Sequence, residues 1–322
     1  MTRESRADER LYADTRFRQG ELLFAQGDYR DAGKAYQGVV DLGAAVPAYE
    51  QALYKLGWSL FKQERYREAL PVLFTSLEQK IEPGKAYSTQ LQDLTPADRE
   101  QAADLLRVIS RSFAQLGGVD TVDQYFRHHG KRAYEDQVYL ALADWYVEQD
   151  QVSEAADTWL VLAQATPLSA QAPRLTSRAI NLYRQAGFQR RTVELQTRFV
   201  LTYGMNSDFW NIHSPDAFPD IVAELQSSLR ETARFAHRQA DETGDARQVR
   251  EAEQRYRDYL AWFGDAPDAA AMNFQLAELL YDHGHYPLAW TEYERTAWSR
   301  GDHPRAAEAA LGAQHAGAKT LQ

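Results

Sequence analysis

The chain has 322 residues, of which 44% are hydrophobic and 25% charged, a composition typical of folded proteins that excludes extensive disorder. Its 36 basic and 46 acidic residues give a formal net charge of −10, which disfavours binding to the phosphate backbone of nucleic acids. Because the sequence has no cysteine, disulfides, zinc thiolates, iron–sulfur clusters and thiol nucleophiles are excluded.

Membrane insertion is not predicted either. No stretch is apolar over the roughly 18 residues that a spanning helix needs, and residues 1–10 are too charged to form a secretory leader. If the protein is exported, we expect its leader to be absent from this chain.

An internal repeat begins near the N-terminus. A pattern of small, aromatic, small and large residues recurs at an offset of 37 residues, so that Gly20, Tyr29, Ala32 and Tyr36 align with Gly57, Tyr66, Ala69 and Leu73. Small residues allow two helices to approach closely where they cross, and the large ones fill the space alongside. Each copy is therefore predicted to be a pair of antiparallel helices.

Further copies of the pattern follow along the chain. The two clear copies are Ala143, Val152, Ala155, Trp159 and Ala277, Tyr286, Ala289, Tyr293. The two weaker copies are Ser110, Val119, Val122, Phe126 and Ala179, Phe188, Arg191, Leu195. In the last of these, Arg191 stands where a small residue is expected. A degenerate copy is expected over 219–263.

The sequence also predicts the turn between the two helices of a pair. In the first, Gly27 is predicted to adopt a left-handed conformation that ends one helix, and Asp28 to cap the next. The turn at 283–287 repeats this arrangement, with Pro287 tolerated in a first helical turn. Because one hairpin cannot bury its apolar face alone, successive hairpins are expected to stack.

These residues resemble the tetratricopeptide repeat family, and the match is fullest over 142–167 and 276–293. The resemblance implies an all-α, right-handed superhelical solenoid of antiparallel helical hairpins. The offset of 37 residues exceeds the usual 34 of that family, and the extra length falls in 43–47. The longer units are similar to bacterial cell-envelope members, including the outer-membrane assembly lipoprotein and Tol–Pal-associated proteins.

The array is interrupted at 203–220, where helix breakers accompany the large apolar residues Phe209, Trp210 and Phe218. We expect this stretch to pack against the helices and to divide the chain into an N-terminal solenoid of about five hairpins, 1–205, and a C-terminal solenoid, 206–322. A long helix over about 219–242 is expected to lead the second. A second departure, 81–96, lengthens the connection after the second repeat, and the alanine-rich half repeat 303–322 is either a cap or the edge of a longer protein.

Catalytic and metal sites are not indicated by the sequence. The adjacent His128 and His129 diverge on a helix, and Asp282, His283 and His285 are ordinary turn residues. The sequence has neither a nucleophile elbow nor a phosphate-binding or dinucleotide-binding glycine motif. We therefore expect a protein that is not an enzyme and has no cofactor.

The resemblance places the first helix of each hairpin on the inner surface, where a protein or peptide ligand would bind. On each first helix, the inward-facing positions fall at fixed steps around the first small residue of the repeat. These steps predict the following groove residues: Phe17, Glu21, Phe24, Tyr54, Trp58, Phe61, Lys62, Arg107, Arg111, Asp144, Glu148, Phe274, Glu278 and Tyr281. Packing alone does not require an indole at position 58, so Trp58 is the best candidate for a residue that binds the ligand. The aromatic residues of this set are expected to stack along the groove as a ladder. The alternatives are that Phe24 and Phe61 are only core residues between repeats, and that the charges only keep the helices soluble.

Family members that clamp the C-terminal carboxylate of chaperones need lysine and asparagine at inward sites. Here those sites hold Phe17, Glu21, Lys55 and Asp104, so that only Lys55 matches in charge. We therefore expect a different ligand. Because the predicted groove changes from aromatic to basic to acidic residues along the chain, a peptide with an apolar anchor followed by charged residues would match it.

The leading hypothesis is a scaffold or adaptor that binds protein in its concave groove, in a bacterial envelope assembly of the periplasm, or else in the cytoplasm. Two alternatives remain open: an architectural component that self-associates, and a regulatory or docking segment of a longer enzyme or secretion protein.

Overall fold

The structure is a computed structural model that describes residues 3–299 and 304–321, and over these residues every regular element is a helix. The chain divides into two compact units, 1–162 and 163–322. The break expected after residue 205 thus falls within the second unit, and the domain boundary proposed from the sequence remains a prediction.

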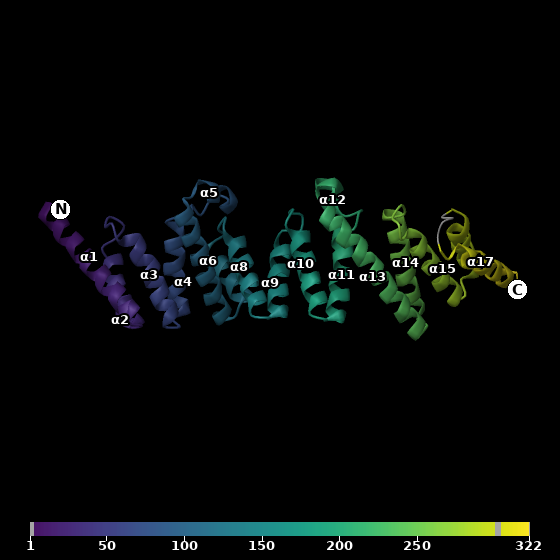
Figure 1. Ribbon diagram of the computed structural model, residues 1–322, viewed down its shortest axis with the longest axis horizontal. Coiled ribbons are helices and arrows are strands. Elements are labelled where there is room, and N and C mark those ends of the chain that lie inside the picture. The colour runs from purple at the N-terminus through teal and green to yellow at the C-terminus, as the bar shows by residue number, and fades with distance from the viewer. Residues whose placement is uncertain (1–2, 300–303, 322) are drawn as a thin grey trace. The chain divides into compact units, whose positions relative to one another are not determined.

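The first unit contains eight helices and the start of a ninth, which lie in chain order (Figure 1). Their bounds are α1 Arg3–Ala25, α2 Tyr29–Val40, α3 Tyr49–Lys62, α4 Tyr66–Glu78, α5 Tyr87–Asp93, α6 Pro96–Leu116, α7 Val119–His129, α8 Glu135–Glu148 and α9 Val152–Ala165. Neighbours pack as α1 on α2, α2 on α3, α3 on α4, α4 on α6 and α6 on α8. The lengthened connection at 81–96 contains the short helix α5.

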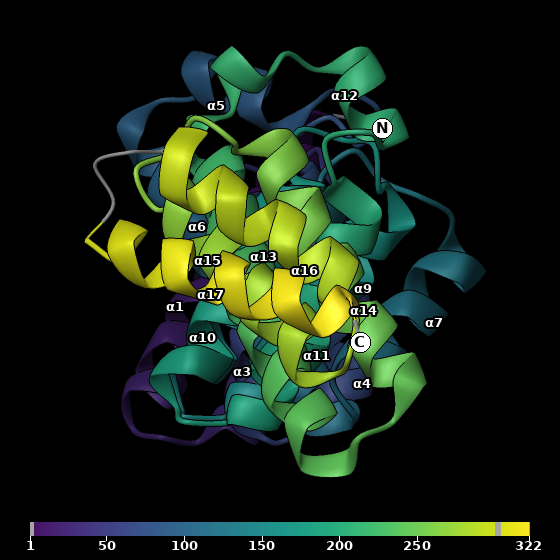
Figure 2. The ribbon, with the colours of Figure 1, turned by 90° about the vertical axis from the view of Figure 1, so that its right-hand side faces the viewer.

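The second unit follows the same principle. Its elements after α9 are α10 Ala172–Gln185, α11 Gln189–Tyr203, α12 Asp208–Ile212, η1 Pro215–Ala217, α13 Pro219–Thr243, α14 Ala246–Trp262, α15 Ala269–Asp282, α16 Tyr286–Glu294, η2 Arg295–Ser299 and α17 Ala306–Thr320. The pairs α10–α11, α13–α14 and α15–α16 pack as hairpins, and α17 lies against α16 (Figure 2). The predicted all-α fold of stacked helical hairpins is confirmed within each unit.

The small residues occupy the helix crossings, as predicted. A Cβ atom on Gly20 would lie 2.5 Å from the ring of Tyr36, and one on Gly57 would lie 2.5 Å from the side chain of Leu73. Each large residue therefore fills the space that its glycine leaves open. In α11 the pattern shifts by one position: Arg191 is exposed, and Thr192 is the buried small residue.

The turns also confirm the prediction. Gly27 has φ +81°, and the amide of Asp28 donates to the carbonyl of Leu23 at 2.9 Å, which closes the first helix. The Asp28 carboxylate then accepts from the amide of Asp31 at 3.1 Å. At the corresponding turns of the second and fourth hairpins, Glu64 and Asp150 adopt φ of 60° and 57° although they are not glycine.

The interruption packs against the helices, as expected. Phe209 is fully buried and Phe218 is 7% exposed, while Trp210 donates from Nε1 to the carbonyl of Tyr203 at 2.8 Å. The long helix α13 follows. The half repeat expected over 303–322 contains α17, although residues 303 and 322 lie outside the described residues. In α17, Ala309, Ala313 and Ala316 are buried.

Candidate functional site

The candidate site lies in the first unit, on the first helices of three successive hairpins, α1, α3 and α6. Two carboxylates, Glu21 on α1 and Asp104 on α6, hold the side chains of this surface in place. We call it the α1–α3–α6 face.

Glu21 links the first hairpin to the second. Its Oε1 accepts from the Tyr36 hydroxyl at 2.6 Å and lies 3.0 Å from Nζ of Lys55 on α3. Burial acts to raise the pKa of the Glu21 carboxyl, but the hydrogen bonds from Tyr36 and Lys55 outweigh it and leave that pKa below its usual value. Glu21 therefore stays ionised, and Lys55, whose ammonium also lies 5.2 Å from the ring of Phe24, is already paired.

Asp104 links the second hairpin to the third. Its Oδ2 accepts from the Tyr54 hydroxyl at 2.7 Å and from Nε1 of Trp58 at 3.1 Å, and its Oδ1 accepts from Nη1 of Arg107 at 2.8 Å. Burial first, and then the hydrogen bond to Asp104, raises the pKa of Tyr54 to about 12. These side chains border a pocket of about 450 Å³ between α3 and α6, lined by Tyr54, Ala97, Glu100, Gln101, Asp104 and Arg107.

The aromatic residues of this face make their ring contacts within hairpins. Trp58 packs edge-on against Phe61 at 5.7 Å, and Phe61 against Tyr66 at 5.5 Å. The ammonium of Lys62 lies 5.7 Å from the Trp58 ring, at the exposed edge of the face. Between the hairpins of this face, polar contacts run through Glu21 and Asp104. The ladder of rings along the groove stays a prediction.

The structure brings together the predicted residues of the first two hairpins other than Phe17, and Arg107 with them. Phe17 packs against Tyr36 at 5.7 Å and against a core cluster that includes Ala13 and Val39. Arg111 is partly buried on α6, and its Nε has no hydrogen-bond partner among the described residues. Asp144 and Glu148 are exposed on α8. Asp104 was recognised in the sequence only as a mismatch to the carboxylate clamp, because nothing in the sequence shows that Tyr54 and Trp58 converge on it.

The three predicted residues of the second unit behave differently. Phe274 is 1% exposed, packs against Tyr293 and is covered by the guanidinium of Arg305 at 3.8 Å, so its assignment to an open groove is wrong. Glu278 accepts a hydrogen bond from the Tyr293 hydroxyl, as Glu21 does from Tyr36. Tyr281 is partly buried between the rings of Tyr286 and Tyr293.

Ordinary structural contacts account for two of the histidines considered above. His129 stacks on Tyr125 at 4.1 Å, and His283 pairs with Asp241 at 3.2 Å. Within residues 3–299 and 304–321, no three side chains of the metal-ligating types are grouped as a metal ion requires. In the same part of the chain, no helix combines the length and the apolar character needed to span a bilayer.

Comparison with known families bears on the first two hairpins. Residues 14–42 and 51–74 match the family model described as tetratricopeptide repeat. These two segments are similar to tetratricopeptide repeats. They contain both Gly20 and Gly57, and they supply α1 and α3 of the α1–α3–α6 face.

Three solved structures align along most of the chain at low identity. The TPR2AB domain–pHSP90 complex of yeast Sti1 is 13% identical, with 95% of this chain and 98% of that chain covered and a TM-score of 0.29. The apo form of RapI is 10% identical, with 94% and 99% covered and a TM-score of 0.31. A kinesin-light-chain-type protein of nearly identical TPR-like repeats from Podosopora anserina is 13% identical, with 86% and 99% covered and a TM-score of 0.26. No curated protein matches the chain.

Proposed function

We propose that this chain is a non-enzymatic scaffold that binds a segment of a partner protein on the α1–α3–α6 face. The observation that supports this most directly is that Tyr54, Trp58 and Phe61 are only partly buried. Tyr54 lines the 450 Å³ pocket, and Trp58 donates a hydrogen bond to Asp104 of the same pocket. Partly exposed aromatic side chains held in fixed positions give binding energy at a low cost in side-chain entropy.

The charges of the face define what the partner segment should contain. The pocket is lined by Glu100, Asp104 and Arg107, and Arg107 is already paired with Asp104, which leaves Glu100 to attract a basic group. The exposed Lys62 beside Trp58 attracts an acidic group. The segment that fits places an apolar side chain against the Trp58 and Phe61 rings, with charged residues on either side.

The test is affinity capture with the intact biotinylated chain and three variants. Trp58→Ala combined with Phe61→Ala removes the rings of the face, whereas Lys62→Glu reverses a charge at its exposed edge and leaves the rings in place. The matched control is Trp290→Ala with Trp298→Ala, at positions that are 43% and 74% exposed in the second unit. Thermal unfolding of every variant, followed by circular dichroism, establishes that each is folded.

We expect the same captured bands to be lost from the Trp58 and Phe61 variant and weakened by Lys62→Glu, while the control retains them. Bands retained by the Trp58 and Phe61 variant would contradict the assignment of the binding face. Bands lost only from the Trp290 and Trp298 variant would place binding on the C-terminal helices instead.

One observation favours a second candidate, a self-associating architectural component. Apolar side chains stand exposed on α16 and α17, among them Leu288 at 45%, Trp290 at 43% and Leu311 at 57%. Sedimentation of the chain over a range of concentrations tests it: a mass that rises with concentration and is lowered by Leu311→Lys supports self-association, and a constant monomer mass rejects it.

The bacterial envelope assembly is part of the proposal as well, and it rests on the sequence resemblance alone. Fractionation of cells that express the protein with its native flanking sequence tests this location, and recovery in the cytoplasm would contradict it.

A further inference from the structure

A pocket of about 280 Å³ lies within the second unit, and none of the residues that line it belongs to the α1–α3–α6 face. The turn after α10 at Gly187, the start of α11 and the middle of α13 enclose it. Its walls are formed by Arg184, Gly187, Gln189, Thr192, Val193, Glu231, Arg234, Phe235 and Arg238. A volume near the lower limit of small-ligand sites fits one side chain of a partner better than an extended ligand.

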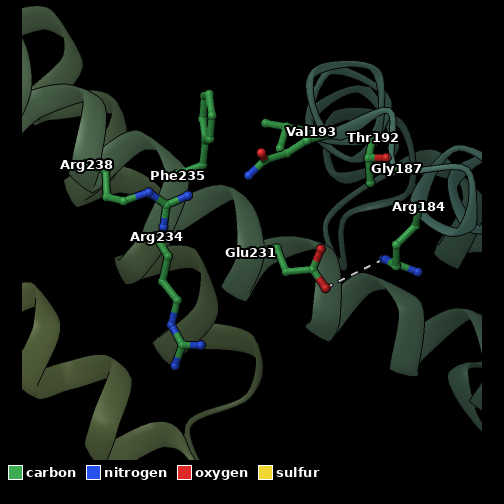
Figure 3. Close-up of a pocket in the computed structure, with 9 residues that line it drawn as sticks. Arg184, Gly187, Thr192, Val193, Glu231, Arg234, Phe235 and Arg238 are labelled. Atoms are coloured by element: carbon green, nitrogen blue, oxygen red, sulfur yellow. Dashed lines mark ion pairs between the residues drawn. The ribbon is translucent and has the colours of Figure 1, made fainter.

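The apolar part of this pocket is formed by two side chains that come from different helices. Val193 of α11 and Phe235 of α13 stand on opposite sides of the opening (Figure 3). Phe235 is partly exposed there. An apolar group inserted between the two would be removed from water on both sides.

The single acidic group of the pocket is already satisfied. Glu231 accepts from Gln196 at 2.6 Å and from Ser227 at 3.0 Å, and it lies 3.6 Å from the guanidinium of Arg184, the pair marked in Figure 3. Arg184 in turn lies 3.3 Å from Glu224. The charges of Arg184 and Glu231 therefore compensate each other within the fold.

The other two arginines have no such compensation. Arg234 donates from Nε to the neutral Gln275 at 3.2 Å, and the guanidinium of Arg238 lies 5.8 Å from the ring of Phe235. Among the described residues, neither guanidinium has a carboxylate within ion-pair distance, although Arg230, one turn before Arg234, pairs with Asp268 at 2.9 Å. Both side chains are exposed, so they give the opening a local positive charge in a chain whose net charge is −10.

We propose that this pocket binds an acidic segment of a partner protein, with one apolar side chain of that segment inserted between Val193 and Phe235 and its carboxylates on Arg234 and Arg238. A guanidinium binds a carboxylate through two parallel hydrogen bonds, which makes a pair of unpaired arginines specific for acidic residues beside the anchor. This site differs from the α1–α3–α6 face in its unit and in the charge it selects, so it would give the scaffold a second, independent point of attachment.

The experiment measures fluorescence polarisation of a labelled peptide with the full chain. The probe is a fluorescein-labelled heptapeptide that has a central phenylalanine, two acidic residues on each side of it and a terminal glycine completing each flank. Two matched peptides replace the phenylalanine by serine or all acidic residues by lysine. A labelled oligothymidylate of the same net charge tests whether negative charge alone is sufficient.

Three variants of the protein accompany these probes. Arg234→Glu with Arg238→Glu reverses the two free charges, and Phe235→Ala removes the apolar wall. The matched control, Arg67→Glu with Arg198→Glu, makes the same charge change at two exposed positions outside the pocket. Because all four arginines are exposed, both double variants are expected to fold, and circular dichroism checks this.

We expect the acidic phenylalanine peptide to bind the wild-type chain and to lose at least about tenfold in affinity with the Arg234 and Arg238 variant, with Phe235→Ala and after the change of its phenylalanine to serine. The control variant should bind within about twofold of wild type, and added salt should weaken binding. The proposal is overturned if the peptide does not bind, if the two double variants bind equally well, or if the serine peptide or the oligothymidylate binds as tightly as the probe. A Trp58 variant that binds this peptide normally would show that the two sites are separate.

Discussion

The indole of Trp58 donates from Nε1 to Oδ2 of Asp104 at 3.1 Å, and this bond joins the second hairpin to the third. The sequence gives no packing reason for an indole at this position and therefore predicts that truncating it leaves stability unchanged. The structure gives a different expectation, because Trp58 also packs against Phe61 at 5.7 Å. The proposed binding and the stability of the fold thus both depend on the same side chain.

We expect Trp58→Phe to lower the free energy of unfolding by about 0.5–1.5 kcal/mol, since the ring remains and only one hydrogen bond is lost. Trp58→Ala should cost about 2–3 kcal/mol, because a partly buried ring is also removed. Urea denaturation measures both values. The exposed Trp290→Ala is the control, and an equal loss at Trp58 and Trp290 would contradict a joining role for Trp58.

Gly20 provides a test of the helix crossing. A Cβ atom there would lie 2.5 Å from the ring of Tyr36, whose hydroxyl is held by Glu21 at 2.6 Å, so the ring cannot easily withdraw. We expect Gly20→Ala to destabilise the chain by about 1–3 kcal/mol through overpacking, despite the higher helix propensity of alanine.

The matched control for Gly20 is Gly317 of α17, where a Cβ atom would meet nothing within 4 Å. Gly317→Ala should stabilise the chain by about 0.5–1 kcal/mol. Thermal or urea unfolding of the two variants gives the comparison. Stabilisation by both substitutions would show that the close approach at Gly20 is not a structural constraint.

The sequence predicts the hairpins well because their main signal is local and periodic. Where two helices cross, a small residue such as Gly20 or Gly57 is needed. Where the chain reverses in a left-handed turn, glycine is favoured, as at Gly27, because it adopts a positive φ without steric strain. These requirements act over a few residues. They are therefore visible in the chain before any tertiary contact is known.

The contacts of the candidate sites were not predictable in the same way. Asp104 lies 46 residues after Trp58, and only the stacking of α6 on α3 brings the two together. Phe274 occupies a position that the repeat pattern assigns to the groove, but Arg305 covers it from a segment beyond the repeat. The pocket between Val193 and Phe235 depends on how α11 meets α13 after an irregular insertion.

The turns at Glu64 and Asp150 show that the repeat imposes its geometry even without glycine. Glu64 has φ 60°, and the amide of the next residue, Arg65, donates to the carbonyl of Leu60 at 3.0 Å, as at the glycine-containing turns. A left-handed conformation costs an L-residue about 1–2 kcal/mol, and glycine avoids most of that cost while losing more entropy on folding.

We therefore expect Glu64→Gly and Asp150→Gly each to raise the free energy of unfolding by about 0.5–1 kcal/mol. Gln149→Gly, next to Asp150 but at φ −96°, is the control and should lower stability. Denaturant titration measures all three. Destabilisation by the first two substitutions would mean that the Glu64 and Asp150 side chains contribute more than their backbone strain costs.

Asp268 gives the second unit a dependence on pH. Its carboxylate accepts a hydrogen bond from the Tyr259 hydroxyl and lies 2.9 Å from Nη1 of Arg230, so that it connects α13, α14 and the start of α15. Burial acts to raise the pKa of Asp268, but the bonds from Tyr259 and Arg230 outweigh it and leave that pKa below the ordinary value of 3.8. The ionised form is thus favoured by folding.

A carboxyl whose pKa is lower in the folded state stabilises that state fully above the unfolded pKa, and its contribution disappears as the pH falls through the folded one. The difference in Tm between wild type and Asp268→Asn should therefore be largest near neutral pH and should shrink below about pH 4. Thermal unfolding across this range measures it, with Asp265→Asn, at an exposed position of the same loop, as the control for net charge. A Tm difference for Asp268→Asn that stays constant from neutral to acidic pH would mean that the network depends on the shape of the side chain and not on its charge.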